Sequence, residues 1–306
     1  MILRAPPRLS PGDRVAVVAP SGPVPRERFE AGLAALGDRY RISFGEGLYA
    51  RAGFLAGSDE RRLAELSAAL ADPSIRAVLC ARGGHGLTRL LPDLEGVLRA
   101  APKKPIVGFS DVTALHLACL RAGLRSIHAP VVAQLSLLDD PAAAVADLGA
   151  RLESPEPPPA WTGLRVIAGG PPVTGVALGG NLELVTRLLG TPWSPPFAGA
   201  VLFLEEVTER PYRLDRQLTQ LHLAGALAAV AGVVVGELVG CDDEGGPGGP
   251  IRGDDVVAER LSSLGVPVLA GAPFGHGAIN RAFVHGGRVR LDARGGAVEF
   301  LDGAVA

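Results

Sequence analysis

The sequence has few cysteines, and they form neither a metal pattern nor a disulfide pattern. Cys80, Cys119 and Cys241 are an odd number without the paired spacing of a zinc site. A disulfide framework is therefore excluded, and this cysteine usage is typical of a reducing compartment. Cys80 and Cys119 lie in apolar runs, so we expect both in the core.

Long hydrophobic runs and clusters of one charge are also missing. The apolar run 15–19 has the length of a strand and is far too short to span a membrane. The first 13 residues contain no apolar core of signal-peptide length. The net charge is −2 without a basic cluster, so no surface is expected for nucleic acid or an anionic membrane. We expect a soluble, cytoplasmic protein.

The composition that is present describes a globular protein of two-domain length. The 306 residues are 47% hydrophobic and 20% charged, which favours packed cores over disorder. A chain of this length can form two domains of ordinary size. The 41 glycines and 26 prolines are dispersed without a repeat, which excludes a collagen-like protein.

The first half of the chain alternates between strand and helix patterns. Strands separated by helices of this length indicate βαβ units on a mostly parallel sheet, and so an α/β fold. Strands are expected at 14–19, 75–81, 106–107 and 126–128, and helices at 25–36, 58–71 and after Ser110.

Residues 153–172 interrupt this pattern with six prolines and two adjacent glycines, which predicts an interdomain linker. The predicted domains are therefore residues 1–152 and 173–306. In the second domain we expect strands at 173–178, 200–205, 230–235 and 266–269, helices at 182–189, 212–224 and 254–264, and a hairpin from 287–291 and 297–301. The stretch 242–253 has no apolar periodicity, so we expect a mobile loop there.

The segment 104–116 contains the most informative junction of the chain. A strand pattern ends at Gly108, and Ser110 and Asp111 come where the next helix should begin. A serine there lies beside unpaired backbone N–H groups at the positive end of a helix dipole, which suits a nucleophile whose oxyanion needs donors. The position also suits a helix N-cap, for which serine is a favoured residue.

Three further segments are candidates for the site. Two of them lie at the ends of predicted strands, where open α/β sheets bind ligands, and the third has a histidine between glycines. The glycine-rich loop 82–86 fits no nucleotide fingerprint, but it can bring backbone N–H groups close to an oxyanion. Glu205 stands at the end of an apolar strand. This position suits either a catalytic acid or an ion-pair partner of Arg213 or Arg216. His276 lies between two glycines. This position suits either a catalytic base or a solvated surface residue.

Ser110, Glu205 and His276 together supply a nucleophile, an orienting acid and a base, in the chain order of α/β-hydrolases. The segment 108–112 lacks the second glycine of the Gly-x-Ser-x-Gly elbow, which disfavours an ordinary α/β-hydrolase.

The chain resembles the L,D-carboxypeptidases, also called muramoyltetrapeptide carboxypeptidases, whose broader family includes microcin-immunity serine peptidases. The resemblance runs almost end to end, and its motifs are specific through their joint order and spacing. They are Pro11-Gly12-Asp13, Ala19-Pro20-Ser21, the segments 56–61, 81–86 and 108–115, Gly179-Gly180-Asn181-Leu182, Leu204-Glu205-Glu206, the segment 211–216, and Phe274-Gly275-His276.

This resemblance implies a Rossmann-like N-terminal domain, a C-terminal α/β domain and an active site at their interface. Ser110 corresponds to the nucleophile, Glu205 to the acid and His276 to the base. Backbone N–H groups of Gly84 and Asp111 correspond to the oxyanion hole. The implied reaction is release of terminal D-Ala from muropeptide tetrapeptides, in peptidoglycan recycling, with no metal or organic cofactor. We expect a homodimer.

Some assignments stay open at this point. Glu209 is a rival to Glu205 as the acid, since it lies only four residues further on. Arg82 is a candidate for binding the terminal carboxylate of the substrate, or for a salt bridge that holds its loop. The family often has Tyr where this chain has His85, and Asp where it has Glu206, so His85 is a second candidate for substrate binding.

Two other functions remain open. A microcin-immunity-like peptidase would cleave an aminoacyl- or peptidyl-nucleotide amide, and an aromatic stacking platform would favour it; with 5% aromatic residues, none is obvious. A non-catalytic α/β binding module would keep Ser110 only as a helix cap. The sequence also leaves open whether the third substrate residue is diaminopimelate or lysine.

Overall fold

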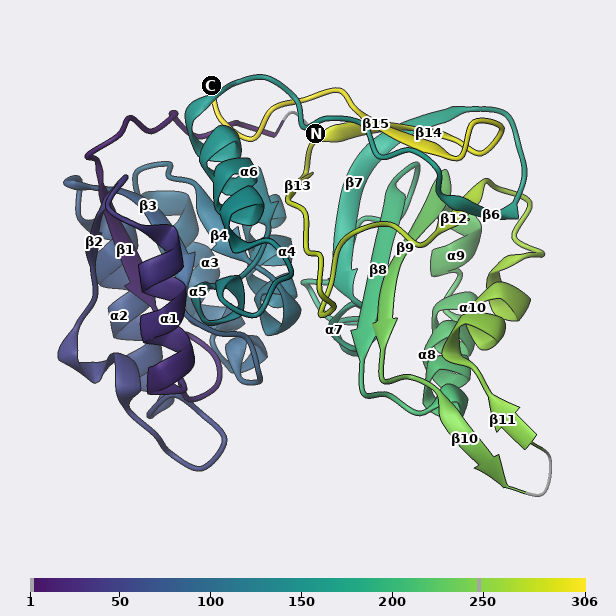
Figure 1. The fold of residues 1–306 in the computed structure, drawn as a ribbon, viewed down its shortest axis with the longest axis horizontal. Helices are drawn as coiled ribbons and strands as arrows, with labels where there is room; N and C mark the ends of the chain where they lie inside the picture. The colour runs from purple at the N-terminus through teal and green to yellow at the C-terminus, as the bar shows by residue number, and fades with distance from the viewer. Residues whose placement is uncertain (1–2, 247–248) are drawn as a thin grey trace. The chain divides into compact units, whose positions relative to one another are not determined.

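The computed structural model describes residues 3–246 and 249–306, which divide into two compact units (Figure 1). Unit 1 contains Met1–Pro158, Asn280–Gly286 and Asp302–Ala306, and unit 2 contains Pro159–Ile279 and Gly287–Leu301. The predicted second domain, 173–306, differs from this division, because two of its segments belong to unit 1. One of them, residues 280–286, contains a strand that pairs with the sheet of unit 1.

Unit 1 is built on a six-stranded sheet in the order β13-β5-β4-β3-β1-β2. Strands β1 to β5 are all parallel, and β13 is antiparallel to β5. The order 2-1-3-4-5 is that of a doubly wound α/β fold whose switch point lies between β1 and β3. The Rossmann-like expectation is therefore confirmed. The elements are β1 (Arg14–Val18), α1 (Arg26–Leu36), β2 (Arg41–Ser43), η1 (Glu46–Tyr49), α2 (Asp59–Ala71), β3 (Ile75–Cys80), η2 (Leu87–Arg89), α3 (Leu91–Ala100), β4 (Ile106–Gly108), η3 (Ser110–Val112), α4 (Thr113–Arg121), β5 (Ser126–His128), α5 (Val132–Leu135), α6 (Pro141–Glu153) and β13 (Phe283–His285).

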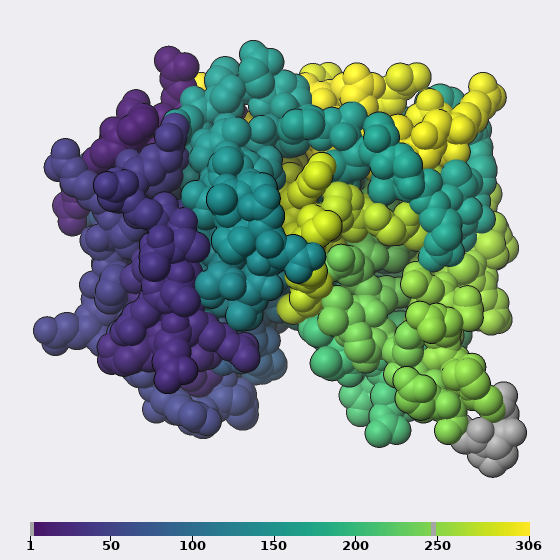
Figure 2. All heavy atoms as spheres, in the orientation of Figure 1, coloured from purple at the N-terminus to yellow at the C-terminus, as the bar shows by residue number. Residues whose placement is uncertain are grey.

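Helices cover both faces of this sheet, as the doubly wound order requires. Figure 1 shows α1, α5 and α6 on one face and α2, α3 and α4 on the other. Figure 2 shows the purple atoms of α1 beside the teal atoms of α6 on this face of unit 1. Val17, Leu79 and Val107 of the strands are buried in one core with Phe29 of α1 and Leu148 of α6. Burying each such side chain stabilises the fold by about 1.5–3 kcal/mol.

Unit 2 has a seven-stranded sheet in the order β15-β14-β7-β8-β9-β12-β6. The four central strands are parallel, whereas β6 and the hairpin of β14 and β15 pair antiparallel at the two edges. The elements are β6 (Arg165–Ala168), β7 (Val173–Asn181), α7 (Leu182–Arg187), β8 (Val201–Val207), α8 (Pro211–Leu223), α9 (Ala226–Ala229), β9 (Gly232–Val239), β10 (Asp243–Gly246), β11 (Gly249–Ile251), α10 (Gly253–Leu261), β12 (Val268–Ala270), β14 (Arg288–Asp292) and β15 (Ala297–Phe300).

Two sequence expectations were wrong in unit 2. The stretch 242–253, expected to be a mobile loop, contains two strands, because β10 and β11 pair antiparallel within it; residues 247–248 lie outside the described part of the chain. The expected linker 153–172 contains β6, which pairs with β12. The expected C-terminal hairpin is confirmed by the pairing of β14 with β15. No helix in residues 3–246 or 249–306 is long and apolar enough to cross a membrane.

Candidate active site

Ser110 has a strained backbone at the end of β4. Its φ is +65°, a value that residues other than glycine adopt rarely. Ser110 is the first residue of η3, whose N-cap is Phe109, and the N-cap of α4 is Val112. Ser110 is therefore the cap of neither helix. Strain of this kind costs about 1–3 kcal/mol and persists at functional sites where the surroundings enforce it.

The glycine loop after β3 lies directly against Ser110. A Cβ added to Gly83 would lie 2.8 Å from Ser110 Cβ and 3.0 Å from its Oγ. The carbonyl oxygen of Gly83 accepts a hydrogen bond of 3.0 Å from the backbone N–H of Gly22, which follows β1. Three strand ends thus meet here, and only glycine fits at position 83. Sequence reasoning singled out Gly84 and missed this role of Gly83.

Asp111 joins the serine turn to the same loop. Its Oδ2 accepts a hydrogen bond of 2.9 Å from the backbone N–H of Leu87. The carboxylate is buried, and burial raises its pKa, while the Leu87 N–H opposes that rise. The guanidinium of Arg62 is also buried, donates to the carbonyl oxygen of Pro20, and lies 2.7 Å from where a Cβ on Gly86 would be. Asp111 and Arg62 therefore fix the position of the glycine loop through hydrogen bonds and packing.

In unit 2, the buried Glu205 pairs with the partly buried His276. Glu205 Oε2 lies 2.7 Å from His276 Nδ1, and the glutamate side chain is fully buried. Burial of His276 opposes its charged form, but the charge and hydrogen bond of Glu205 outweigh it and raise the pKa of His276 above 6.5. Gly275 has φ +127°, and a Cβ there would lie 3.1 Å from both Cβ and Oε2 of Glu205. The pair therefore needs glycine at position 275.

The neighbouring acids have other partners. Arg213 pairs with Glu209 at 3.2 Å and not with Glu205. Glu206 accepts hydrogen bonds of 2.8 Å from Asn181 Nδ2 and from the backbone N–H of Glu183, at the start of α7. Burial raises the pKa of Glu206 to about 7. Of the two alternatives for Glu205, the ion pair with Arg213 or Arg216 was wrong, since its partner is His276.

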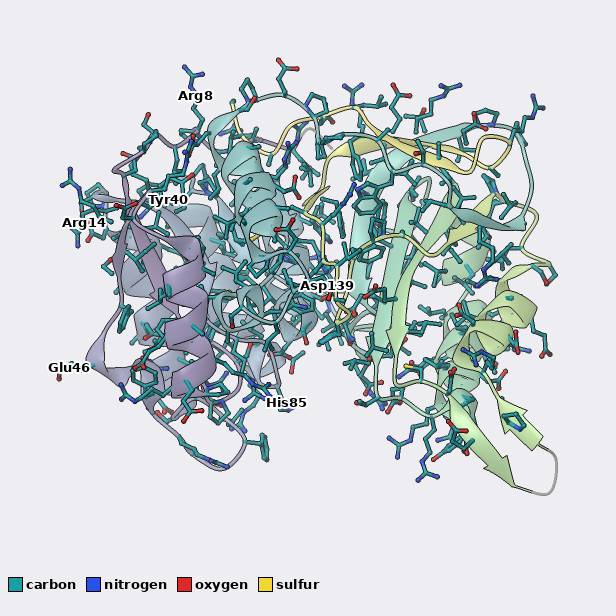
Figure 3. The ribbon with its side chains drawn as sticks, in the orientation of Figure 1. Arg8, Arg14, Tyr40, Glu46, His85 and Asp139 are labelled. Atoms are coloured by element: carbon teal, nitrogen blue, oxygen red, sulfur yellow. The ribbon has the colours of Figure 1, made fainter. Side chains whose placement is uncertain are left out.

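Arg82 and His85 follow β3 at the same end of the unit 1 sheet. Arg82 Nη1 donates to the carbonyl oxygen of Pro23, and no carboxylate within the described residues forms a salt bridge with it. The alternative role of Arg82 in a salt bridge was therefore wrong, although its side chain does bind the loop after β1; its role in substrate binding stays a prediction. His85 is exposed and packs edge-on against Phe54 at 5.4 Å. Figure 3 shows His85 and Arg14, the first residue of β1, at opposite ends of the unit.

The remaining histidines of unit 1 are structural. His116 is buried; its Nε2 lies 2.8 Å from the carbonyl oxygen of Gly108 and its Nδ1 lies 2.8 Å from Ser126 Oγ. It stacks on His285 at 5.3 Å. Cys80 and Cys119 are buried as expected. Within the described ranges, no group of three or more His, Cys, Asp and Glu side chains is arranged to hold a metal ion.

The serine and the Glu–His pair belong to different units, Ser110 to unit 1 and Glu205 and His276 to unit 2. Within unit 1 the structure brings Ser110, Gly83 and the Asp111 carboxylate together. Within unit 2 it brings Glu205 and His276 together. Each half of the expected machinery is therefore pre-arranged in its own unit.

Comparisons with known proteins match both halves of the chain to one family. Residues 15–129 match the LD-carboxypeptidase N-terminal domain, and residues 174–291 match the LD-carboxypeptidase C-terminal domain. A protein of Synechocystis sp. named "Putative carboxypeptidase" is 38% identical, with 96% of each chain covered. The murein tetrapeptide carboxypeptidase of Pseudomonas aeruginosa is 35% identical, with 89% of this chain and 91% of that protein covered.

Solved structures agree with this match. The muramoyltetrapeptide carboxypeptidase from Oxalobacter formigenes has a TM-score of 0.82 at 28% identity and covers 95% of this chain and 99% of its own. The Microcin C7 self immunity protein has a TM-score of 0.88 at 20% identity, with 99% of each chain covered, a likeness that concerns the fold alone. The chain thus belongs to the LD-carboxypeptidase family and is a serine-type carboxypeptidase.

Proposed function

We propose that this carboxypeptidase releases terminal D-Ala from muropeptide tetrapeptides, in peptidoglycan recycling, with Ser110 as nucleophile, Glu205 as acid and His276 as base. The substrate is suggested by two relatives whose names refer to murein or muramoyl tetrapeptides. The observation that carries the proposal is the contact of 2.7 Å between buried Glu205 and His276 Nδ1. It is the arrangement by which an acid orients a catalytic imidazole.

In the proposed reaction, Ser110 Oγ attacks the carbonyl carbon of the amide between the L-configured centre and D-Ala. His276 Nε2 accepts the serine proton as the new C–O bond forms, because Nδ1 is engaged by Glu205. The backbone N–H groups of Gly84 and Asp111 stabilise the oxyanion. His276 then donates the proton to the D-Ala nitrogen as the C–N bond breaks. Water hydrolyses the acyl-enzyme by the same route.

The test is D-Ala release from L-Ala-D-Glu-meso-diaminopimelate-D-Ala by wild type, Ser110→Ala and His276→Ala. Release by wild type and its loss in both variants would support the proposal. Labelling of wild type, but not of Ser110→Ala, by a fluorophosphonate would identify the nucleophile separately. Labelling without D-Ala release would keep the serine mechanism and reject the substrate.

A second candidate substrate is an aminoacyl- or peptidyl-nucleotide amide, cleaved with the same three residues. The observation that favours it is that two aromatic residues, Tyr49 and Phe54, line one pocket of unit 1. The sequence had shown no obvious stacking platform. Related folds have been solved with glutamyl sulfamoyl guanosine and aspartyl sulfamoyl adenosine. Assaying an aspartyl sulfamoyl adenosine beside the tetrapeptide separates the two substrates.

The proposed recycling role places the enzyme in the cytoplasm, acting as a homodimer on soluble muropeptides. Sedimentation equilibrium of the purified chain, of mass 31.4 kDa, tests the dimer, and fractionation of cells that express it tests the compartment. A single species at the monomer mass would reject the dimer without affecting the proposed reaction.

A further inference from the structure

A cavity of about 620 Å³ lies at the switch point of the unit 1 sheet. Residues 22–26, after β1, form one wall, and Arg82, Gly84 and His85, after β3, form another. Doubly wound sheets bind ligands at this place, beyond the carboxyl ends of the strands on either side of the switch. The cavity adjoins Gly84, a proposed oxyanion donor, and is far larger than a terminal alanine needs.

The cavity carries positive charge that the protein does not neutralise. Arg51 and Arg82 line it, and within residues 3–246 and 249–306 neither forms a salt bridge. Other arginines nearby are paired: Arg61 lies 2.6 Å from Glu65, and Arg62 bonds to Asp59. Arg82 is half-buried, and burial together with the charges of Arg28 and Arg51 lowers its pKa. Guanidinium groups gathered without a carboxylate are suited to an anionic ligand.

Aromatic rings complete the cavity wall. Arg26 lies over the ring of Tyr49 at 3.8 Å, and Phe54 is 64% exposed. An exposed phenylalanine beside cations offers an apolar surface to the part of a ligand that carries the anion. Its partner in the structure is His85, at 5.4 Å.

We propose that this pocket binds an anionic oxygen group of the ligand that is separate from the scissile amide. Arg51 and Arg82 bind this anion, and Phe54 packs on the adjoining part of the ligand. The inference rests on the proposed function, and it names the feature of the substrate that the site selects. In a tetrapeptide this oxyanion is the side-chain carboxylate of diaminopimelate, which lysine lacks. In a nucleotide amide it is the phosphate or sulfamate group.

Arg51 offers the cleanest test because it is exposed and, among the residues that the structure describes, its side chain donates only to the carbonyl oxygen of Gly53, at 3.2 Å in its own loop. Wild type, Arg51→Gln, Arg51→Lys and Arg99→Gln are compared on two tetrapeptides with meso-diaminopimelate or L-lysine as third residue. Arg99, an exposed arginine of α3 paired with Glu95, is the matched control for loss of one charge. Binding of both peptides and of AMP is measured by calorimetry in a Ser110→Ala background.

For the diaminopimelate peptide we expect Arg51→Gln to raise KM by about 10- to 100-fold with kcat little changed, as for loss of a hydrogen bond to a charged group. The lysine peptide should change less than about twofold, Arg51→Lys should recover part of the loss, and Arg99→Gln should match wild type.

The titrations separate this inference from the proposed function. If wild type released no D-Ala, the proposed function would fail, but weaker binding of the diaminopimelate peptide or of AMP in the Arg51→Gln background would still support an anion pocket. The ligand that responds identifies the source of the anion. Equal affinities of all three ligands with and without Arg51→Gln, including no binding at all, would overturn the inference.

Discussion

Asp111 Oδ2 accepts a hydrogen bond of 2.9 Å from the backbone N–H of Leu87, so the turn that carries Ser110 and the end of the glycine loop are joined by one buried carboxylate. Leu87 comes after β3 and Asp111 comes after β4, and these two strands are neighbours in the sheet. It explains how a strained serine and a flexible glycine sequence keep one relative position.

Replacing Asp111 should loosen this junction. Asp111→Ala leaves the Leu87 N–H without its acceptor, which costs about 1–3 kcal/mol when the donor is buried. We expect a lower free energy of unfolding by urea and reduced kcat. Asp111→Asn keeps an acceptor oxygen and should lose less of both. Equal losses in the two variants would argue against the hydrogen bond as the cause.

Gly83→Ala should impair catalysis by displacing Ser110. The new methyl would lie 2.8 Å from Ser110 Cβ, so one of the two segments must move. Overpacking of this kind costs about 1–3 kcal/mol, and we expect kcat/KM to fall about 10- to 100-fold. Gly96→Ala is the matched control, because position 96 is in helix α3 with open space around it. It should leave activity unchanged and stabilise the protein slightly. Activity of Gly83→Ala at the level of this control would contradict the prediction.

The acid limb of the pH–rate profile should depend on Glu205. To act as the proposed base, His276 must be neutral, and the Glu205 charge raises the pKa of His276 above its ordinary value of 6.5. Wild-type kcat/KM should therefore fall with decreasing pH through a pKa above 6.5. Glu205→Gln should move this limb to lower pH, because the partial burial of His276 remains while the charge is removed. If Glu205 is the acid, the variant should also lower kcat by about 10⁴-fold, as the corresponding Asp→Asn change does in a Ser-His-Asp triad.

Glu209→Gln is the control for that experiment. Glu209 pairs with Arg213, not with His276, so the variant should keep the wild-type pH profile and nearly the wild-type kcat. A shift of the acid limb in Glu209→Gln, with none in Glu205→Gln, would reverse the assignment of the acid.

His116 should make the fold sensitive to mild acid. Burial lowers its pKa to about 4, against 6.5 in an unfolded chain, and its bond to the Gly108 carbonyl only partly opposes this. Between these values the unfolded chain binds the proton more readily, so stability falls as pH falls from about 6.5 to about 4. At about 1.4 kcal/mol per pKa unit, the loss amounts to about 3 kcal/mol.

Urea unfolding at pH 7.5 and pH 4.5 measures this loss. His116→Gln should show a smaller loss of stability between the two pH values than wild type, and His222→Gln, an exposed histidine on α8, should match wild type. The stacked His285, whose pKa burial also lowers, leaves a residual dependence. Identical slopes for wild type and His116→Gln would exclude His116 as the source.

Local patterns predicted most of the fold because they depend on neighbouring residues. Ser58, followed by two acidic residues, predicted the start of α2, and its Oγ does accept the bond from the Arg61 N–H. The strand β13 was not predicted, because three residues of apolar pattern become a strand only through pairing with β5. The linker prediction failed for β6 for the same reason, since its partner β12 is about a hundred residues away.

The sequence by itself determined the α/β class, most of the order of the elements and the candidate site residues, because periodicity, caps and motifs are properties of consecutive residues. Only the tertiary structure decided which groups meet. The Glu205–His276 contact joins positions 71 residues apart, and the closeness of Gly83 to Ser110 depends on β3 and β4 lying side by side. Such contacts arise from strand pairing and burial, which bring together residues whose separation along the chain carries no local signal.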